Sequence, residues 1–143
     1  MFDLLAFSYD RGTVKLSGFA YEPTLKSDAE REAKSVAGVD TVVNNIEQLP
    51  VSQLDDQIRW TTFRAIYRSP ELSRYGLGLL PPATFGEGPL GDAAIHIIVK
   101  NGHVTLIGVV DNEGDRTLAF MKARGVPGLF GVTNELKVRA RTS

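Results

Sequence analysis

The chain has 143 residues and a formal net charge of −1 at pH 7, so no overall field attracts nucleic acid or anionic lipid, and any electrostatic binding must be local. It contains no cysteine, which excludes disulfides, thiolate nucleophiles and thiolate metal sites. No apolar run in the sequence approaches the roughly 20 residues that span a bilayer, and no signal peptide opens it.

The first predicted element is a β-hairpin around the Arg11-Gly12 turn. Apolar and polar residues alternate over residues 5–10 and 13–18, which is typical of half-buried strands. A two-residue turn predicts three cross-strand pairs, Asp10 with Thr13, Tyr9 with Val14 and Phe7 with Leu16. We expect one apolar face to be buried, made by Leu5, Phe7, Val14 and Leu16.

A helix and a strand complete this first unit. The helix is predicted from apolar residues at helical spacing, with charged residues between them, namely Leu25, Ala29, Ala33 and Val36. Gly38 is expected to end the helix, and residues 41–47 read as a strand. We place the first unit at residues 1–50.

A second helix and a long loop follow. Residues 54–69 contain neither proline nor glycine and predict a helix, whereas residues 70–92 are rich in both and predict a loop. The helix is the opening element of a second unit over residues 51–143. The first unit lacks this helix, because only four residues precede Leu5. Either that segment was trimmed away or the copy is naturally short, and we expect trimming.

The rest of the chain repeats the first unit at a constant offset of 90 residues, without a gap. The shared signature is Gly12, Gly18, Ala29, Ala33, Gly38 and Asn44 in one copy and Gly102, Gly108, Ala119, Ala123, Gly128 and Asn134 in the other. A constant offset through strands, turn and helix indicates two copies of one fold. Because no repeated residue is of a catalytic type, function is expected in what the copies do not share.

The second hairpin turns at Asn101-Gly102, a strong hairpin signal. Its register places His96, Ile98, His103 and Ile107 on the face away from the core. We expect the histidines to be ordinary surface residues, too far apart to share a metal. Ile98 and Ile107 should be neighbours covered by the loop or by a second chain.

The repeated pattern Gly-x-Val-x-Leu-x-Gly, Ala-x-x-x-Ala and Gly-[Val/Leu]-x-x-Val-x-Asn resembles that of the BON domain (bacterial osmotic-shock and nodulation). The resemblance covers the chain outside the 70–92 loop. It implies an α+β fold of two tandem units, each a small three-stranded mixed sheet with packed helices. It also implies a peripheral protein of the bacterial periplasm or cell envelope that binds phospholipid or other envelope components without catalysis. The family carries no defined binding motif, so it transfers no site residue.

The 54–69 helix has two predicted faces. The expected core face consists of Leu54, Ile58, Thr61, Thr62 and Ala65. Asp55 and Asp56 complement the helix dipole. The opposite face carries the candidate lipid or partner site, which comprises Arg59, Trp60, Phe63, Arg64, Tyr67 and Arg68, with Arg74 and Leu77 from the loop. Aromatic rings bordered by arginines suit a membrane interface. The alternative is a helix buried on both sides, against its own sheet and the first copy.

The sequence therefore predicts a non-catalytic protein that binds anionic phospholipid headgroups or an envelope partner. It has no nucleophile elbow, no metal-ligand spacing and no phosphate-binding loop, so we expect no enzyme, no cofactor, no metal and no nucleic-acid partner. The alternative function is a structural protein–protein interaction module, completed by a second chain as a homo-oligomer or by another domain.

Overall fold

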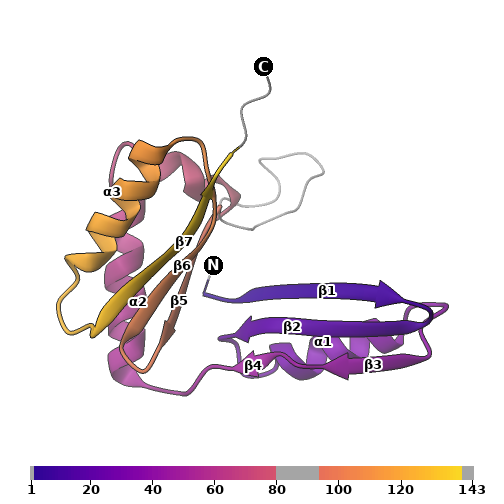
Figure 1. Ribbon diagram of the computed structural model, residues 1–143. Coiled ribbons are helices and arrows are strands. Elements are labelled where there is room, and N and C mark those ends of the chain that lie inside the picture. Colours follow the sequence, from indigo (N-terminus) through magenta and orange to yellow (C-terminus); the bar gives the residue numbers. More distant parts are fainter. Residues whose placement is uncertain (1, 80–93, 140–143) are drawn as a thin grey trace. The chain divides into compact units, whose positions relative to one another are not determined.

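The computed structural model describes residues 2–79 and 94–139, without the side chains of residues 77–79 (Figure 1). The chain divides into two compact units, residues 2–50 and the described residues from Val51 onward. Each unit combines a mixed sheet with one or more packed helices, which confirms the predicted α+β class.

The first unit begins with the predicted hairpin, made by β1 (Leu4–Asp10) and β2 (Thr13–Ala20). The register confirms the three predicted pairs around the turn. After α1 (Leu25–Lys34), the strands β3 (Thr41–Asn44) and β4 (Glu47–Gln48) both pair parallel with the other side of β2. The predicted 41–47 strand is thus present in two pieces, and α1 packs on β2 and β3.

The second unit repeats this order behind an additional helix. Its elements are α2 (Gln53–Tyr67), the 3-10 helix η1 (Ser73–Leu79), β5 (Ile95–Lys100), β6 (His103–Val110), α3 (Glu113–Arg124) and β7 (Gly131–Val138). β5 pairs antiparallel and β7 parallel with β6. α2 packs on β5 and beside α3, so the two helices cover one face of this sheet (Figure 1).

Equivalent residues make the same backbone contacts in both units. Gly18 and Gly108 have φ of +108° and +148°, and a Cβ at either position would lie 1.9 Å from a carbonyl oxygen of the neighbouring strand. Asn44 donates its side-chain N–H to the Lys26 carbonyl oxygen, 2.9 Å away. Asn134 donates in the same way to Arg116, at 3.1 Å. The shared signature therefore fixes strand approach and helix position.

The glycines that we expected to end the helices lie beyond those ends. α1 stops at Lys34 and α3 at Arg124, whereas Gly38 and Gly128 adopt φ of +88° and +87° further along the chain. Each therefore permits a left-handed turn between helix and strand, a backbone conformation that costs glycine little.

The two copies differ in the burial of their first strands, and the predicted burial of Leu5 and Phe7 was wrong. Val14 and Leu16 are buried as expected, but Leu5 is 39% exposed and Phe7 is 77% exposed. Their counterparts Ile95 and Ile97 are fully buried. The physical reason is α2, because it packs on β5 and no helix within residues 2–50 packs on β1 in this way.

On the outer face of the second sheet, one expectation was wrong. Ile98 is buried, in line with the expected cover, but His96 is buried rather than exposed. His96 pairs with Ile107 in the predicted register. His103 remains exposed and its Nε2 lies 2.7 Å from the Thr133 hydroxyl. The expectation of two ordinary surface histidines is therefore correct for His103 and wrong for His96.

We expect Gly108→Ala to lower the free energy of unfolding of the second unit by more than about 2 kcal/mol, because the new Cβ meets the Ala94 carbonyl and the backbone has positive φ. Gly125→Ala is the matched control, since a Cβ there meets only ordinary contacts. Its stability should change by less than about 1 kcal/mol. Urea unfolding followed by circular dichroism measures both, and equal effects would contradict the close approach.

Candidate functional site

The amino-terminal end of α2 is fastened to the second hairpin. Ser52 caps the helix by accepting a hydrogen bond from the Asp55 N–H at 3.1 Å. The buried Asp55 carboxylate accepts the N–H groups of Asn101 and Gly102 at 2.9 and 2.8 Å. Asp55 thus joins helix and turn, a role that its position in the first helical turn did not reveal.

The inner face of α2 differs from the predicted core face. The buried residues are Asp55, Ile58, Arg59, Thr62 and Ile66, whereas Leu54 is 46% exposed. Arg59 was expected beside the exposed aromatic rings and is instead fully buried. Its guanidinium donates to the Val99 carbonyl oxygen at 2.7 Å and to the Asp56 carboxylate at 2.8 Å. Arg59 therefore fastens α2 to β5 and does not reach the outer surface.

The outer face of α2 carries three aromatic rings in contact, which we call the aromatic stripe: Trp60, Phe63 and Tyr67. The Trp60 and Phe63 rings meet edge to face at 5.8 Å, and Phe63 meets Tyr67 at 5.2 Å. Trp60 is 46% exposed, while the Tyr67 hydroxyl donates to the Ile95 carbonyl oxygen at 2.6 Å. The stripe is therefore hydrogen-bonded to β5 at the Tyr67 end and half exposed at the Trp60 end.

Two arginines border the stripe. Arg64 lies one helical turn after Trp60, and Arg68 lies one turn after Arg64. Both arginines are exposed. Neither forms an ion pair with a carboxylate in the part of the chain that the structure describes. The outer face of α2 thus combines exposed aromatic surface with two cationic groups that remain available to an anion.

Arg74 belongs to a polar network that ties η1 to α3. Its guanidinium pairs with Asp111 at 3.3 Å and with Asp115, and it lies 4.6 Å from the Tyr75 ring centre. The Tyr75 hydroxyl donates to Asp115 at 2.6 Å and accepts the Asp111 N–H at 2.9 Å. Because Asp111 and Asp115 already form ion pairs with Arg74, we do not include Arg74 in the candidate lipid site. The Leu77 side chain and loop residues 80–92 lie outside the described part.

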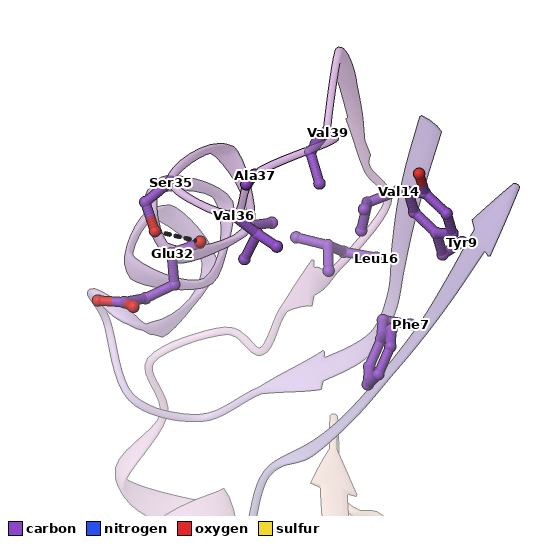
Figure 2. A pocket seen from close by; sticks show the side chains of 10 residues that line it. Phe7, Tyr9, Val14, Leu16, Glu32, Ser35, Val36, Ala37 and Val39 are labelled. Atoms are coloured by element: carbon purple, nitrogen blue, oxygen red, sulfur yellow. Dashed lines mark hydrogen bonds between the residues drawn. The ribbon is translucent and has the colours of Figure 1, made fainter. Parts of the chain in front are cut away.

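The first unit presents an open apolar groove of about 650 Å³ (Figure 2). It lies between the end of α1 and the apolar face of β1, which no helix of the first unit covers. Its lining includes Phe7, Tyr9, Leu16, Glu32, Val36 and Val39. Figure 2 shows the Val36 and Leu16 side chains facing each other across it. Val36 is 57% exposed, whereas its counterpart Val126 is 5% exposed. The missing opening helix predicted an incomplete first unit, but the sequence did not identify the groove or the residues that line it.

The described residues offer no metal site, because nowhere among them do three or more histidine or carboxylate side chains gather closely enough to hold an ion. Within the same part of the chain, no helix is both long and apolar enough to cross a bilayer.

Burial and the hydrogen bond to Asp115 raise the pKa of Tyr75 above its ordinary value of 10.0. A raised pKa means that the network stabilises the fold below about pH 10 and loses this contribution as the pH rises through the folded-state pKa. Tyr75→Phe should cost about 1–2 kcal/mol near neutral pH, and the difference from the unaltered protein should shrink at about pH 11.

Urea unfolding across this pH range measures the difference. Tyr9→Phe changes an exposed tyrosine of the first unit and should leave the unfolding of the second unit unchanged. A stability difference for Tyr75→Phe that stays constant into the alkaline range would contradict the network.

Comparison with known proteins places this fold in a family. The C-terminal domain of CdsD, a structural protein of the type III secretion system of Chlamydia trachomatis, is 14% identical, with 95% of this chain and 90% of that chain covered at a TM-score of 0.31. Another CdsD structure is 12% identical, with 94% and 85% covered at the same TM-score of 0.31. Both likenesses are too distant to support an argument about function. No curated protein matches the chain significantly. The model of the BON domain matches residues 7–50 and 86–140, more than half of the sequence, and the chain therefore belongs to the BON domain family.

Proposed function

We propose that this protein binds anionic phospholipid headgroups at the surface of a bacterial envelope membrane, through the aromatic stripe and the two arginines beside it. The observation that carries the proposal is the outer face of α2, where Trp60 is half exposed and Arg64 and Arg68 have no carboxylate partner among the described residues. Membership of the BON domain family indicates an envelope-associated, non-catalytic role, with which this function agrees.

The chemistry of this face suits a membrane interface. Trp and Tyr combine an apolar ring with a polar group and therefore favour the depth of the lipid headgroups. Arginine presents several N–H donors in a plane that matches phosphate oxygens. Because the stripe lies on a helix whose inner face is fastened to β5, binding requires no rearrangement of the unit.

A second function, protein–protein interaction through the first unit, is favoured by a different observation. Phe7 and Tyr9 are 77% and 59% exposed on the bare side of β1, beside the apolar groove. Contiguous exposed apolar surface is typical of interaction sites. The two functions use separate units and are compatible in one chain.

Vesicle binding tests the lipid site. Trp60 is the only tryptophan, and its emission should shift to the blue when vesicles containing phosphatidylglycerol are added, but not with phosphatidylcholine alone. Arg64→Gln and Arg68→Gln should each weaken binding by about 1 kcal/mol. Added salt should weaken it further by screening. Arg124→Gln removes an exposed charge from α3 and is the matched control, for which we expect unchanged binding.

The competing outcome concerns stability. Because Trp60 is half exposed, Trp60→Ala should cost about 1 kcal/mol, the contribution of its contact with Phe63. An unchanged emission spectrum, together with a loss of roughly 3–5 kcal/mol, would mean that the stripe is an internal packing surface. The lipid site would then be wrong.

A further inference from the structure

The second unit shows how a helix completes this sheet. Ile58 and Ile66 of α2 are buried, as are Ile95, Ile97 and Val99 of β5, on which α2 packs. Two side chains of α2 also donate to the backbone of this edge strand, Arg59 to the Val99 carbonyl and Tyr67 to the Ile95 carbonyl. At its start, Asp55 accepts the N–H groups of Asn101 and Gly102. A helix in this position therefore needs an apolar face, hydrogen-bond donors toward the edge strand and an acceptor for the turn.

The first unit has equivalent carbonyl oxygens on its edge strand, but no helix lies along them within residues 2–50. Leu5, Phe7 and Tyr9 lie at the positions equivalent to Ile95, Ile97 and Val99, in the same hairpin register. In a hairpin with a two-residue turn, the backbone groups at these alternate positions point away from the partner strand. β1 is an edge strand, so its carbonyl oxygens face the side from which a helix would approach. The groove between β1 and α1 is the place that the helix would fill.

Charge distinguishes the helix that fits here from α2 itself. At an offset of 90 residues, Glu32 of the groove replaces Lys122, and Asp40 replaces Phe130. Within the described residues no lysine or arginine forms an ion pair with Glu32 or Asp40. Glu32 lines the groove, and Asp40 directly follows the lining residue Val39. These two positions are acidic where the second unit has a basic and an apolar residue, and they favour a cationic partner.

One end of the groove is already occupied by Tyr9. Its hydroxyl donates to the Gly38 carbonyl oxygen at 3.2 Å. In the second unit the equivalent Gly128 is approached by Leu54 of α2, whose Cδ1 would lie 3.8 Å from an added Cβ. Tyr9 thus stands where the first turn of an opening helix would put a large side chain, so a fitting helix has a small residue there.

We propose that the first unit binds a basic amphipathic helix of another polypeptide in this groove, along β1, as α2 lies along β5. The inference rests on the second of the two proposed functions, protein–protein interaction, and is independent of the lipid site. The helix carries an aliphatic face, a small residue in its first turn next to Tyr9, and arginine or tyrosine donors toward the carbonyl oxygens of Leu5 and Tyr9. Its remaining basic residues meet Glu32 and Asp40.

The probe is a fluorescein-labelled peptide of residues 52–68 of this chain, with Leu54→Ala to leave room for Tyr9 and with Asp56→Asn to remove one acidic charge. Asp55 is kept, because in the second unit its carboxylate accepts the N–H groups of the hairpin turn. Fluorescence anisotropy with the full chain should show saturable binding. The same peptide with Asp56 retained should bind several-fold more weakly, because it brings one more negative charge to a groove that carries Glu32. Peptide binding should also weaken with salt.

Two matched variants of β1 test whether the peptide binds in the groove. Phe7→Asp places a carboxylate in the groove and should weaken the peptide by at least about tenfold, or 1.4 kcal/mol. Ser8→Asp adds the same charge to the opposite face of β1 and should change affinity by less than about twofold. Both residues are exposed, and thermal melts show whether each variant retains the fold. Glu32→Lys should weaken binding as well.

The outcomes separate the proposal from the function on which it rests. Peptide binding that is insensitive to Phe7→Asp would overturn the proposal. Absence of peptide binding, together with self-association that Phe7→Asp abolishes, would overturn the helix while retaining protein interaction, with a second copy as the partner. Absence of both would overturn the helix and the interaction function together. The fatty acid laurate is added in a parallel titration as a competing apolar occupant of the groove. Binding of laurate without binding of the peptide would also overturn the proposal. None of these results bears on the vesicle assay.

Discussion

The packing of α2 on β5 is the contact on which the difference between the two units depends. It buries Ile95, Ile97 and Val99 completely and is fastened by Asp55, Arg59 and Tyr67 to the backbone of the second hairpin. Burial of apolar surface supplies most of the stabilising free energy of small domains. Where this contact is absent, the same sheet presents an apolar groove, and α1 has no buried residue. One added helix thus converts an exposed apolar surface into a core.

The scaffold itself does not depend on that helix. Gly18 and Gly108 permit the same close strand approach, and Asn44 and Asn134 make the same bond to the start of the following helix. These residues specify hairpin, helix and parallel strand in both copies. The proposed functional surfaces lie instead on residues that differ between the copies, such as Glu32 against Lys122, or that have no counterpart, such as the aromatic stripe. Duplication therefore supplied one fold with two different surfaces.

The hairpin register could be predicted from the sequence, because a two-residue turn at Asn101-Gly102 leaves only one alternation of faces. Burial could not be predicted equally well. Treating the copies as equivalent led to a wrong prediction for Leu5 and Phe7, since burial depends on a covering element and not on the strand's own pattern. Helical spacing predicted which residues of α2 share a face, but it could not predict how the helix is rotated on the sheet. Arg59 was therefore predicted on the exposed face, although it is buried. The network around Arg74 joins residues about 40 positions apart, a separation at which local patterns carry no signal.

Native-state hydrogen exchange of the full chain, followed by NMR, tests most directly whether the missing helix leaves the first core incomplete. Equivalent amides such as those of Ala33 and Ala123, or Val14 and Val104, form matched pairs in the same fold. Our account predicts that the first member of each pair exchanges at least about a hundredfold faster, because an uncovered sheet opens at lower free energy. Equal protection in the two units would contradict it, since α2 would then contribute nothing that the first unit lacks.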